Sequence, residues 1–146
     1  MLRKPLLLLS SLMLLAGCGE DTPQEAVTST FVAAMDALHD HRYDEYMESV
    51  DYGCEMDSIQ RAVLVRTYSQ YLDRLQQSNG DLLNLNVVDV AFGSDTVCDV
   101  YYEMLFADST SVEHCQKMVR IGDVWKLRAR NLKRIILLLV FFRTKI

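Results

Sequence analysis

The sequence predicts an α+β domain in which three N-terminal helices pack on one face of a curved, four-stranded antiparallel meander. Two observations lead to this prediction. Up to Gly80 the apolar residues recur at helical spacing, whereas beyond Gly80 they alternate with polar residues, as they do in half-buried strands. Helices that precede a run of strands and lie on one side of an antiparallel sheet define the α+β class.

The first helix is expected to begin at Pro23. Thr22 can cap it, proline suits the first helical position, and Glu25 stands where a capping box requires an acid. Apolar residues then fall on one face at helical spacing, namely Val27, Phe31, Ala34 and Leu38. The polar stretch 39–42 indicates a loop after this helix.

Two further helices are expected before Gly80. A short one covers about 43–50 and is closed by 51–53. Asp57 and Gln60 form a second capping box, which opens the longest helix over 58–78, and Asn79-Gly80 stops it. The apolar positions of this long helix include Ile59, Val63, Leu64, Tyr68, Tyr71, Leu72 and Leu75.

Four strands are expected at 82–92, 97–106, 111–121 and 124–127, with turns at Gly93-Ser94, 107–110 and Gly122-Asp123. Alternate residues of the second strand lie on one face of the sheet, and this face should pack against the helices. Its residues are Cys98, Val100, Tyr102, Met104 and Phe106. The Gly93-Ser94 turn pairs them with Leu83, Leu85 and Val87. This inward face is apolar apart from the Tyr102 hydroxyl.

The start of the chain has the layout of a secretory signal over residues 1–17. Arg3 and Lys4 precede a short apolar run over 6–16, which is about half the ~20 residues that a membrane-spanning helix needs. The motif at 15–18, Leu-Ala-Gly-Cys, resembles the bacterial lipobox. That resemblance implies a diacylglyceryl group on Cys18, which becomes the mature N-terminus and is then usually acylated. The alternative is an ordinary cleaved signal with a chance cysteine.

The residues after Cys18 bear on localisation. Gly19, which stands where aspartate would signal inner-membrane retention, favours the outer membrane by resemblance to the sorting rule of Gram-negative lipoproteins. Glu20 and Asp21 resemble an acidic export signal, and they equally suit a solvated tether. The envelope is therefore the expected location, with the periplasmic or surface face left open.

Charge is distributed unevenly along the chain. Residues 18–123 carry all 20 acidic residues and six basic ones, a net charge of −14, whereas 124–146 carry seven basic residues and no acid. An acidic body argues against nucleic acid as a partner. The C-terminal segment 131–146 holds eight consecutive apolar residues flanked by basic ones. It is too short to span a bilayer as a helix, and could be an added strand, a patch resting on lipid or a frayed extension.

Three features together resemble a known group of proteins. A lipoprotein start, a helix opening with Pro23-x-x-Ala26 and a sheet ending in Gly-Asp-Val-Trp-Lys-Leu at 122–127 are similar to small bacterial lipoproteins of unknown function with a nuclear-transport-factor-like, or cystatin-like, domain. The resemblance covers 18–130. It implies a curved sheet that wraps the long helix to form a cone, which holds a small molecule, a catalytic pair or only core.

Within that cone, one group of residues is a candidate pocket: Tyr68, Tyr71, Tyr102 and His114. We favour ordinary core aromatics with hydroxyl groups near the rim. His39 and His41 with Asp40, Asp44 and Glu45 suggest a metal site, but their spacing is less ordered than that of usual sites, so a solvated loop is the better interpretation. No motif for a cofactor is present.

Three cysteines remain beyond Cys18, in a compartment that favours disulfides. The helix 58–78 rises ~30 Å and the strand 82–92 returns ~34 Å, so Cys98 should come back near Cys54. A Cys54–Cys98 disulfide is the preferred pairing, with three buried thiols as the alternative.

The function expected from these observations is a lipid-anchored envelope lipoprotein that acts as a non-enzymatic binding or accessory domain. Its membrane contact is the lipid on Cys18, and its further partner is an envelope protein or a small ligand. The alternative is an isomerase- or dehydratase-type enzyme that uses a pocket in the cone, which would require an acid, base or tyrosine with a perturbed pKa.

Overall fold

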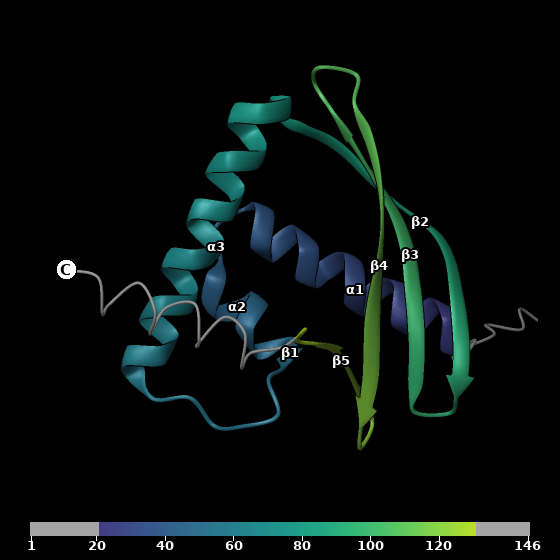
Figure 1. Ribbon diagram of the computed structural model, residues 1–146. Coiled ribbons are helices and arrows are strands. Elements are labelled where there is room, and N and C mark those ends of the chain that lie inside the picture. Colours follow the sequence, from purple (N-terminus) through teal and green to yellow (C-terminus); the bar gives the residue numbers. More distant parts are fainter. Residues whose placement is uncertain (1–20, 131–146) are drawn as a thin grey trace, which may run out of the picture.

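The computed structural model describes residues 21–130, and the signal peptide predicted for 1–17, Cys18 and the segment 131–146 lie outside the described residues. Three helices lie on one face of a five-stranded mixed sheet, whose strand order is β1-β5-β4-β3-β2 (Figure 1). The elements are α1 (Pro23–His39), α2 (Tyr43–Glu48), β1 (Val50–Asp51), α3 (Ser58–Asn79), β2 (Leu82–Ser94), β3 (Val97–Phe106), β4 (Ser111–Ile121) and β5 (Val124–Arg128).

Helix α1 begins as the sequence predicts. The Thr22 hydroxyl accepts a hydrogen bond from the Glu25 backbone N–H, and the Glu25 carboxylate accepts one from the Thr22 N–H. This reciprocal capping satisfies two N–H groups that a helix start leaves without partners. All four residues of the predicted apolar face are buried: Val27, Phe31, Ala34 and Leu38.

Helix α2 is shorter than expected, because the chain leaves it for a strand that the sequence did not indicate. The helix ends at Glu48, and Val50–Asp51 pair in parallel with β5 as strand β1. The backbone N–H groups of Leu127 and Ala129 donate to the carbonyls of Ser49 and Asp51. The predicted four-stranded antiparallel meander is therefore corrected to a five-stranded mixed sheet.

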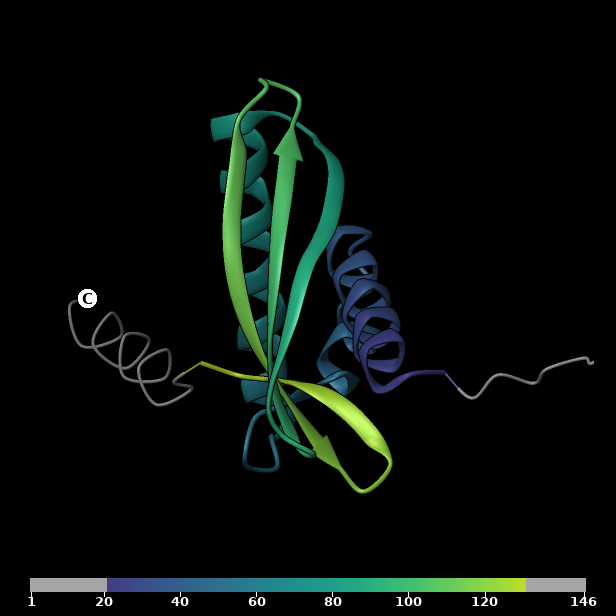
Figure 2. The same ribbon diagram turned by 90° about the vertical axis from the view of Figure 1, so that its right-hand side faces the viewer.

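Helix α3 has the predicted start, with a capping box formed by Asp57 and Gln60, and it stops at Gly80. It does not carry the core, however. Only Leu64 and Leu72 are buried along it, and the side chain of Ile59 is 70% exposed. The expectation that the sheet wraps the long helix is thus wrong for this chain, since the shorter α1 supplies the buried helical face. Figure 2 shows α3 behind the strands and α1 beside them.

The strands of the meander have nearly the predicted bounds, but the first turn is displaced. Strand β2 continues through Gly93-Ser94, and the turn to β3 consists of Asp95 and Thr96. The Thr96 N–H donates to the Ser94 hydroxyl across this turn. The other two turns, at 107–110 and at Gly122-Asp123, lie where the sequence predicts them.

Strand β2 carries bulges that change which of its residues face the helices. Leu85 and Val87 pair with Met104 and Tyr102, as expected. Leu83 was predicted to face inward, but a register shift beside it leaves its side chain 63% exposed. Each bulge inserts a residue into one strand of a pair, and such an insertion moves the following side chains to the other face.

One continuous core joins the sheet to the helices. Phe31 of α1, Leu72 of α3, and Trp125 and Leu127 of β5 all belong to it, as the apolar periodicity predicts. The four apolar residues of β3 that were predicted to face the helices are buried, and Tyr102 on the same face is half-buried. Within residues 21–130, no helix combines the length and the apolar character needed to cross a membrane.

Candidate functional site

The most distinctive polar feature of the described domain is a cluster of five tyrosines between the helices and the sheet. We call it the tyrosine cluster; its members come from α2, the loop after β1, α3 and β3, and are Tyr46, Tyr52, Tyr68, Tyr71 and Tyr102. Two of the three tyrosines predicted for a pocket, Tyr68 and Tyr102, are half-buried, and Tyr71 is more exposed.

The rings of the cluster pack on one another and on α1. The Tyr52 and Tyr68 hydroxyl oxygens are 2.7 Å apart and share a hydrogen bond. The Tyr46 ring meets the Tyr68 ring edge-on, with centroids 5.1 Å apart, and the Tyr102 ring lies 4.8 Å from the core residue Phe31. These are the tilted and edge-to-face arrangements that aromatic pairs prefer.

The cluster is electrically neutral at physiological pH. Burial raises the pKa of Tyr46 and of Tyr68 well above the ordinary value of 10, and it raises the pKa of Tyr52 and of Tyr102 to about 12. Removing a phenol from water disfavours its charged form, so the hydroxyl groups keep their protons. They can donate hydrogen bonds to a ligand, but they are poor proton acceptors.

His114 lies on the same face of the sheet as Tyr102, where the two residues pair across β3 and β4. Their rings are stacked, with centroids 5.6 Å apart and planes inclined by 29°. His114 is exposed and contributes to an open hollow of ≈490 Å³, together with Tyr101, Tyr102, Glu113 and Cys115. The structure therefore joins Tyr102 and His114 at the rim of the cluster, through ring stacking.

Sequence reasoning missed Tyr46 and Tyr52. Tyr46 precedes the buried Met47 in α2, and Tyr52 directly follows β1. A signal for Tyr46 was present, because Tyr43, Tyr46, Met47 and Val50 recur at the i, i+3, i+4, i+7 spacing of an amphipathic helix. Tyr52 had none, since its position depends on the β1–β5 pairing, which connects segments far apart in the sequence.

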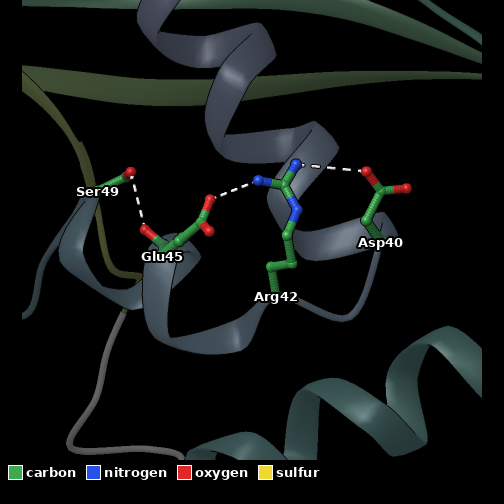
Figure 3. A network of polar contacts seen from close by, with 4 residues as sticks. All are labelled: Asp40, Arg42, Glu45 and Ser49. Atoms are coloured by element: carbon green, nitrogen blue, oxygen red, sulfur yellow. Dashed lines mark hydrogen bonds and ion pairs between the residues drawn. The ribbon is translucent and has the colours of Figure 1, made fainter.

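The loop between α1 and α2 engages its carboxylates in ion pairs. The Arg42 guanidinium contacts Glu45 and lies 3.3 Å from Asp40, and the Ser49 hydroxyl donates to the Glu45 backbone carbonyl (Figure 3). Asp44 lies 3.4 Å from Arg61. Among residues 21–130, no three His, Cys, Asp or Glu side chains gather in a way that could hold a metal ion.

The two histidines of this region have different surroundings. The His41 ring nitrogen Nδ1 lies 2.7 Å from the Tyr43 hydroxyl. The Nε2 atom of His39 is buried and lacks a hydrogen-bond partner among the described residues. Burial lowers the pKa of His39 below the ordinary 6.5, against the opposing effect of Asp36 and Asp40. His39 also borders a cavity of ≈320 Å³ between α1, α3 and the start of β2.

The cysteines do not form the expected bridge. Cys54, Cys98 and Cys115 are free thiols; Cys54 is exposed, Cys98 is buried, and burial raises the pKa of Cys98 to about 11. The lengths of the helix and the strand fix how far the chain returns along the strands, but not how far apart two segments lie across them. Figure 1 shows that the loop before α3 and the β2–β3 turn lie on opposite sides of the molecule, separated across the direction of the strands.

Comparisons with known proteins support the fold. No protein-family model matches the chain, and no curated protein sequence matches it. A solved structure from Campylobacter jejuni, provisionally named an NTF2-like transpeptidase, is similar in fold with a TM-score of 0.57 and 8% sequence identity. The match covers 70% of this chain and 97% of that one. The described domain thus has an NTF2-like fold, and at this identity the likeness extends to the fold alone.

Proposed function

We propose that this protein is a lipid-anchored lipoprotein of the bacterial envelope, and that its NTF2-like domain is a non-enzymatic binding or accessory domain. The anchor is the lipid on Cys18, and the outer membrane is the expected location. The domain binds a small ligand or an envelope protein through its exposed surfaces. The activity implied by the name of the structural neighbour is not carried over to this chain.

The chemistry of the tyrosine cluster is the observation that supports a non-enzymatic role. Proton transfer needs an acid or base whose pKa lies near the working pH and which is within hydrogen-bond reach of the reacting group. The phenols of the cluster are held neutral by burial, and two of them bond to each other. Among the described residues, no charged side chain is buried.

The anchor is supported by the motif at 15–18 behind a basic and apolar leader. Several acyl chains make the attachment stable, because each buried methylene contributes ~0.8 kcal/mol and one chain alone binds only marginally. We expect Cys18→Ala to release the protein from membranes or to stall its processing. Cys54→Ala, which changes an exposed cysteine of the folded domain, should leave both unchanged.

Membrane fractionation measures the attachment of the parent and the variants, and mass spectrometry of the mature N-terminus measures their processing. The proposed anchor is wrong if the parent chain is membrane-bound with an unmodified N-terminus, or if Cys18→Ala is bound as well as the parent. Native mass spectrometry of the membrane-extracted protein reports a bound ligand in the same preparation.

The stacking of Tyr102 on His114 supports an enzyme as the second candidate function. An imidazole next to a phenol could exchange protons with a small molecule in the hollow that they line. In that case a ligand found by native mass spectrometry should be converted by the parent chain, and conversion should fall in both Tyr102→Phe and His114→Gln. A bound ligand that the parent leaves unchanged supports the binding domain instead.

A further inference from the structure

Three segments that are distant in the sequence meet at one end of the domain. The start of α1, the β2–β3 turn and the β4–β5 turn line one open hollow; each segment contributes a residue, among them Pro23, Asp95 and Asp123. The rings of Phe92 and Trp125 lie in the same hollow, with centroids 6.0 Å apart. We call this the α1-start end of the domain.

The α1-start end lies close to the anchoring residue of the proposed function. Asp21 borders the hollow and is three residues after Cys18. Because consecutive residues span at most ~3.6 Å each, the Cα atom of Cys18 is within about 11 Å of the Cα atom of Asp21. A lipid on Cys18 would therefore keep this end of the domain close to the membrane surface.

The same end exposes large apolar side chains at its hairpins. Ile121 and Val124, which pair across the β4–β5 turn, are 52% and 55% exposed, and Phe92 near the β2–β3 turn is 42% exposed. Each buried methylene of such a side chain contributes ~0.8 kcal/mol on transfer from water. Exposed apolar residues at the tip of a hairpin next to a lipid anchor are suited to the boundary between headgroups and acyl chains.

Charge at the α1-start end limits the kind of membrane that it fits. Asp21, Asp95 and Asp123 outnumber Arg120, whose guanidinium lies 3.3 Å from Asp123. This net negative charge would be repelled by an anionic surface but not by a zwitterionic one. The surface therefore fits a bilayer that is zwitterionic overall.

From these observations, and resting on the proposed lipid anchor, we infer that the α1-start end lies on the bilayer, with Ile121 and Val124 in contact with lipid. The opposite end of the sheet, where β2 begins and β3 ends, points away from the membrane. A strand of ten residues such as β3 rises ~34 Å, so the two ends differ in height above the bilayer by up to that distance.

The chain's single tryptophan allows this orientation to be tested. In the Trp125→Phe background, Val124→Trp places a tryptophan at the α1-start end, and Leu83→Trp places one at the opposite end, at a position of similar exposure. The lipidated proteins are reconstituted in phosphatidylcholine vesicles whose acyl chains carry bromine, which quenches nearby tryptophan. We expect loss of fluorescence for Val124→Trp and none for Leu83→Trp.

The unaltered chain supplies a second measurement that does not depend on how the variants fold. Trp125 borders the hollow at the α1-start end, so spin-labelled headgroups should quench it in the lipidated protein. Equal quenching at both ends, or quenching of Leu83→Trp alone, would overturn the inference while leaving the anchor intact. A protein that does not attach to the vesicles overturns the anchor and the inference together.

Discussion

At the scale of single residues, the tyrosine side chains that pack against the core are polar but uncharged. The hydroxyl groups of Tyr52 and Tyr68 form a hydrogen bond between α3 and the loop after β1, and burial keeps both phenols protonated. A buried polar group that lacks a partner is costly, whereas a paired one contributes modestly to stability. The contrast is with His39, whose buried Nε2 atom has no partner among the described residues.

Removing one hydroxyl of the Tyr52–Tyr68 pair should destabilise the domain. We expect Tyr52→Phe or Tyr68→Phe to lower the free energy of unfolding by ~1 kcal/mol, because each leaves the other hydroxyl without its partner. The double variant should lose less than the sum of the two. Urea denaturation followed by circular dichroism measures this, with the exposed Tyr101→Phe as the control. Strictly additive losses would contradict coupling between the two hydroxyls.

His39 should make stability depend on pH. Burial lowers the pKa of His39 in the folded state below 6.5, so the unfolded chain binds its proton more readily. The stabilising effect is present above 6.5, and it is lost as the pH falls through the folded-state pKa. We expect His39→Gln to flatten the decline in unfolding free energy below 6.5, measured by urea denaturation at several pH values.

His114→Gln is the matched control for this prediction, since it changes an exposed histidine on the sheet. It measures, on the same curve, the effect of replacing a histidine away from the buried site. Parallel curves for His39→Gln and the parent would show that His39 titrates alike in the folded and unfolded chain.

At the scale of elements, helix α3 is defined by its ends more than by its packing. The Asp57–Gln60 capping box opens it and Gly80 closes it, while only two of its residues are buried. Gly80 has a φ of 78°, a conformation that side chains with a Cβ atom rarely adopt. A Cβ atom at this position would also lie 3.1 Å from the Cβ atom of Ala107 in the turn after β3.

Gly53, in the loop after β1, and Gly80, at the end of α3, both have a positive φ but differ in what a Cβ atom would meet. Gly53→Ala adds a Cβ atom into open space at a φ of 72°, so we expect a loss of ~1–2 kcal/mol from the left-handed conformation alone. Gly80→Ala combines a positive φ with a ψ of −165°, a backbone region that is essentially restricted to glycine, and with the contact to Ala107, so it should lose more. Thermal unfolding of the two variants measures the difference. Equal losses would mean that neither the ψ of Gly80 nor the contact to Ala107 adds to the cost of the positive φ.

For the whole molecule, stability depends on a core that α1 and the sheet build together. Trp125 of β5 packs near Phe92 of β2, and both lie beside the start of α1. The same core contains Val50 of the short strand β1 and Leu72 of α3. A single unfolding transition is therefore expected of the domain, as for most small domains.

Truncating Trp125 tests this shared core. Trp125→Ala should lower the free energy of unfolding by ~3–5 kcal/mol, because it leaves a cavity where helix and sheet meet. Val124→Ala, at the exposed neighbouring position, should change it by no more than ~0.5 kcal/mol. Urea denaturation of both variants measures the contrast. If their midpoints coincide, Trp125 does not contribute to the core in this way.

The sequence alone determined most elements of the domain, since local signals decide where helices and strands begin and end. Both capping boxes, the stop at Gly80 and the bounds of β3 and β4 lie where the residues predict them. The burial of Phe31, Trp125 and Leu127 also followed from periodicity, because a repeat of apolar residues fixes which face turns away from water.

Only the tertiary structure decided the features that depend on contacts between distant segments. Strand β1 exists because Val50–Asp51 reach β5, a pairing that no local pattern records, and it brings Tyr52 towards Tyr68. The bulges of β2 turned Leu83 outward, and the loop before α3 lies apart from the β2–β3 turn across the strands (Figure 1), so the expected disulfide is absent. Local periodicity describes one element at a time, whereas register, spacing and the composition of the tyrosine cluster depend on how the elements pack together.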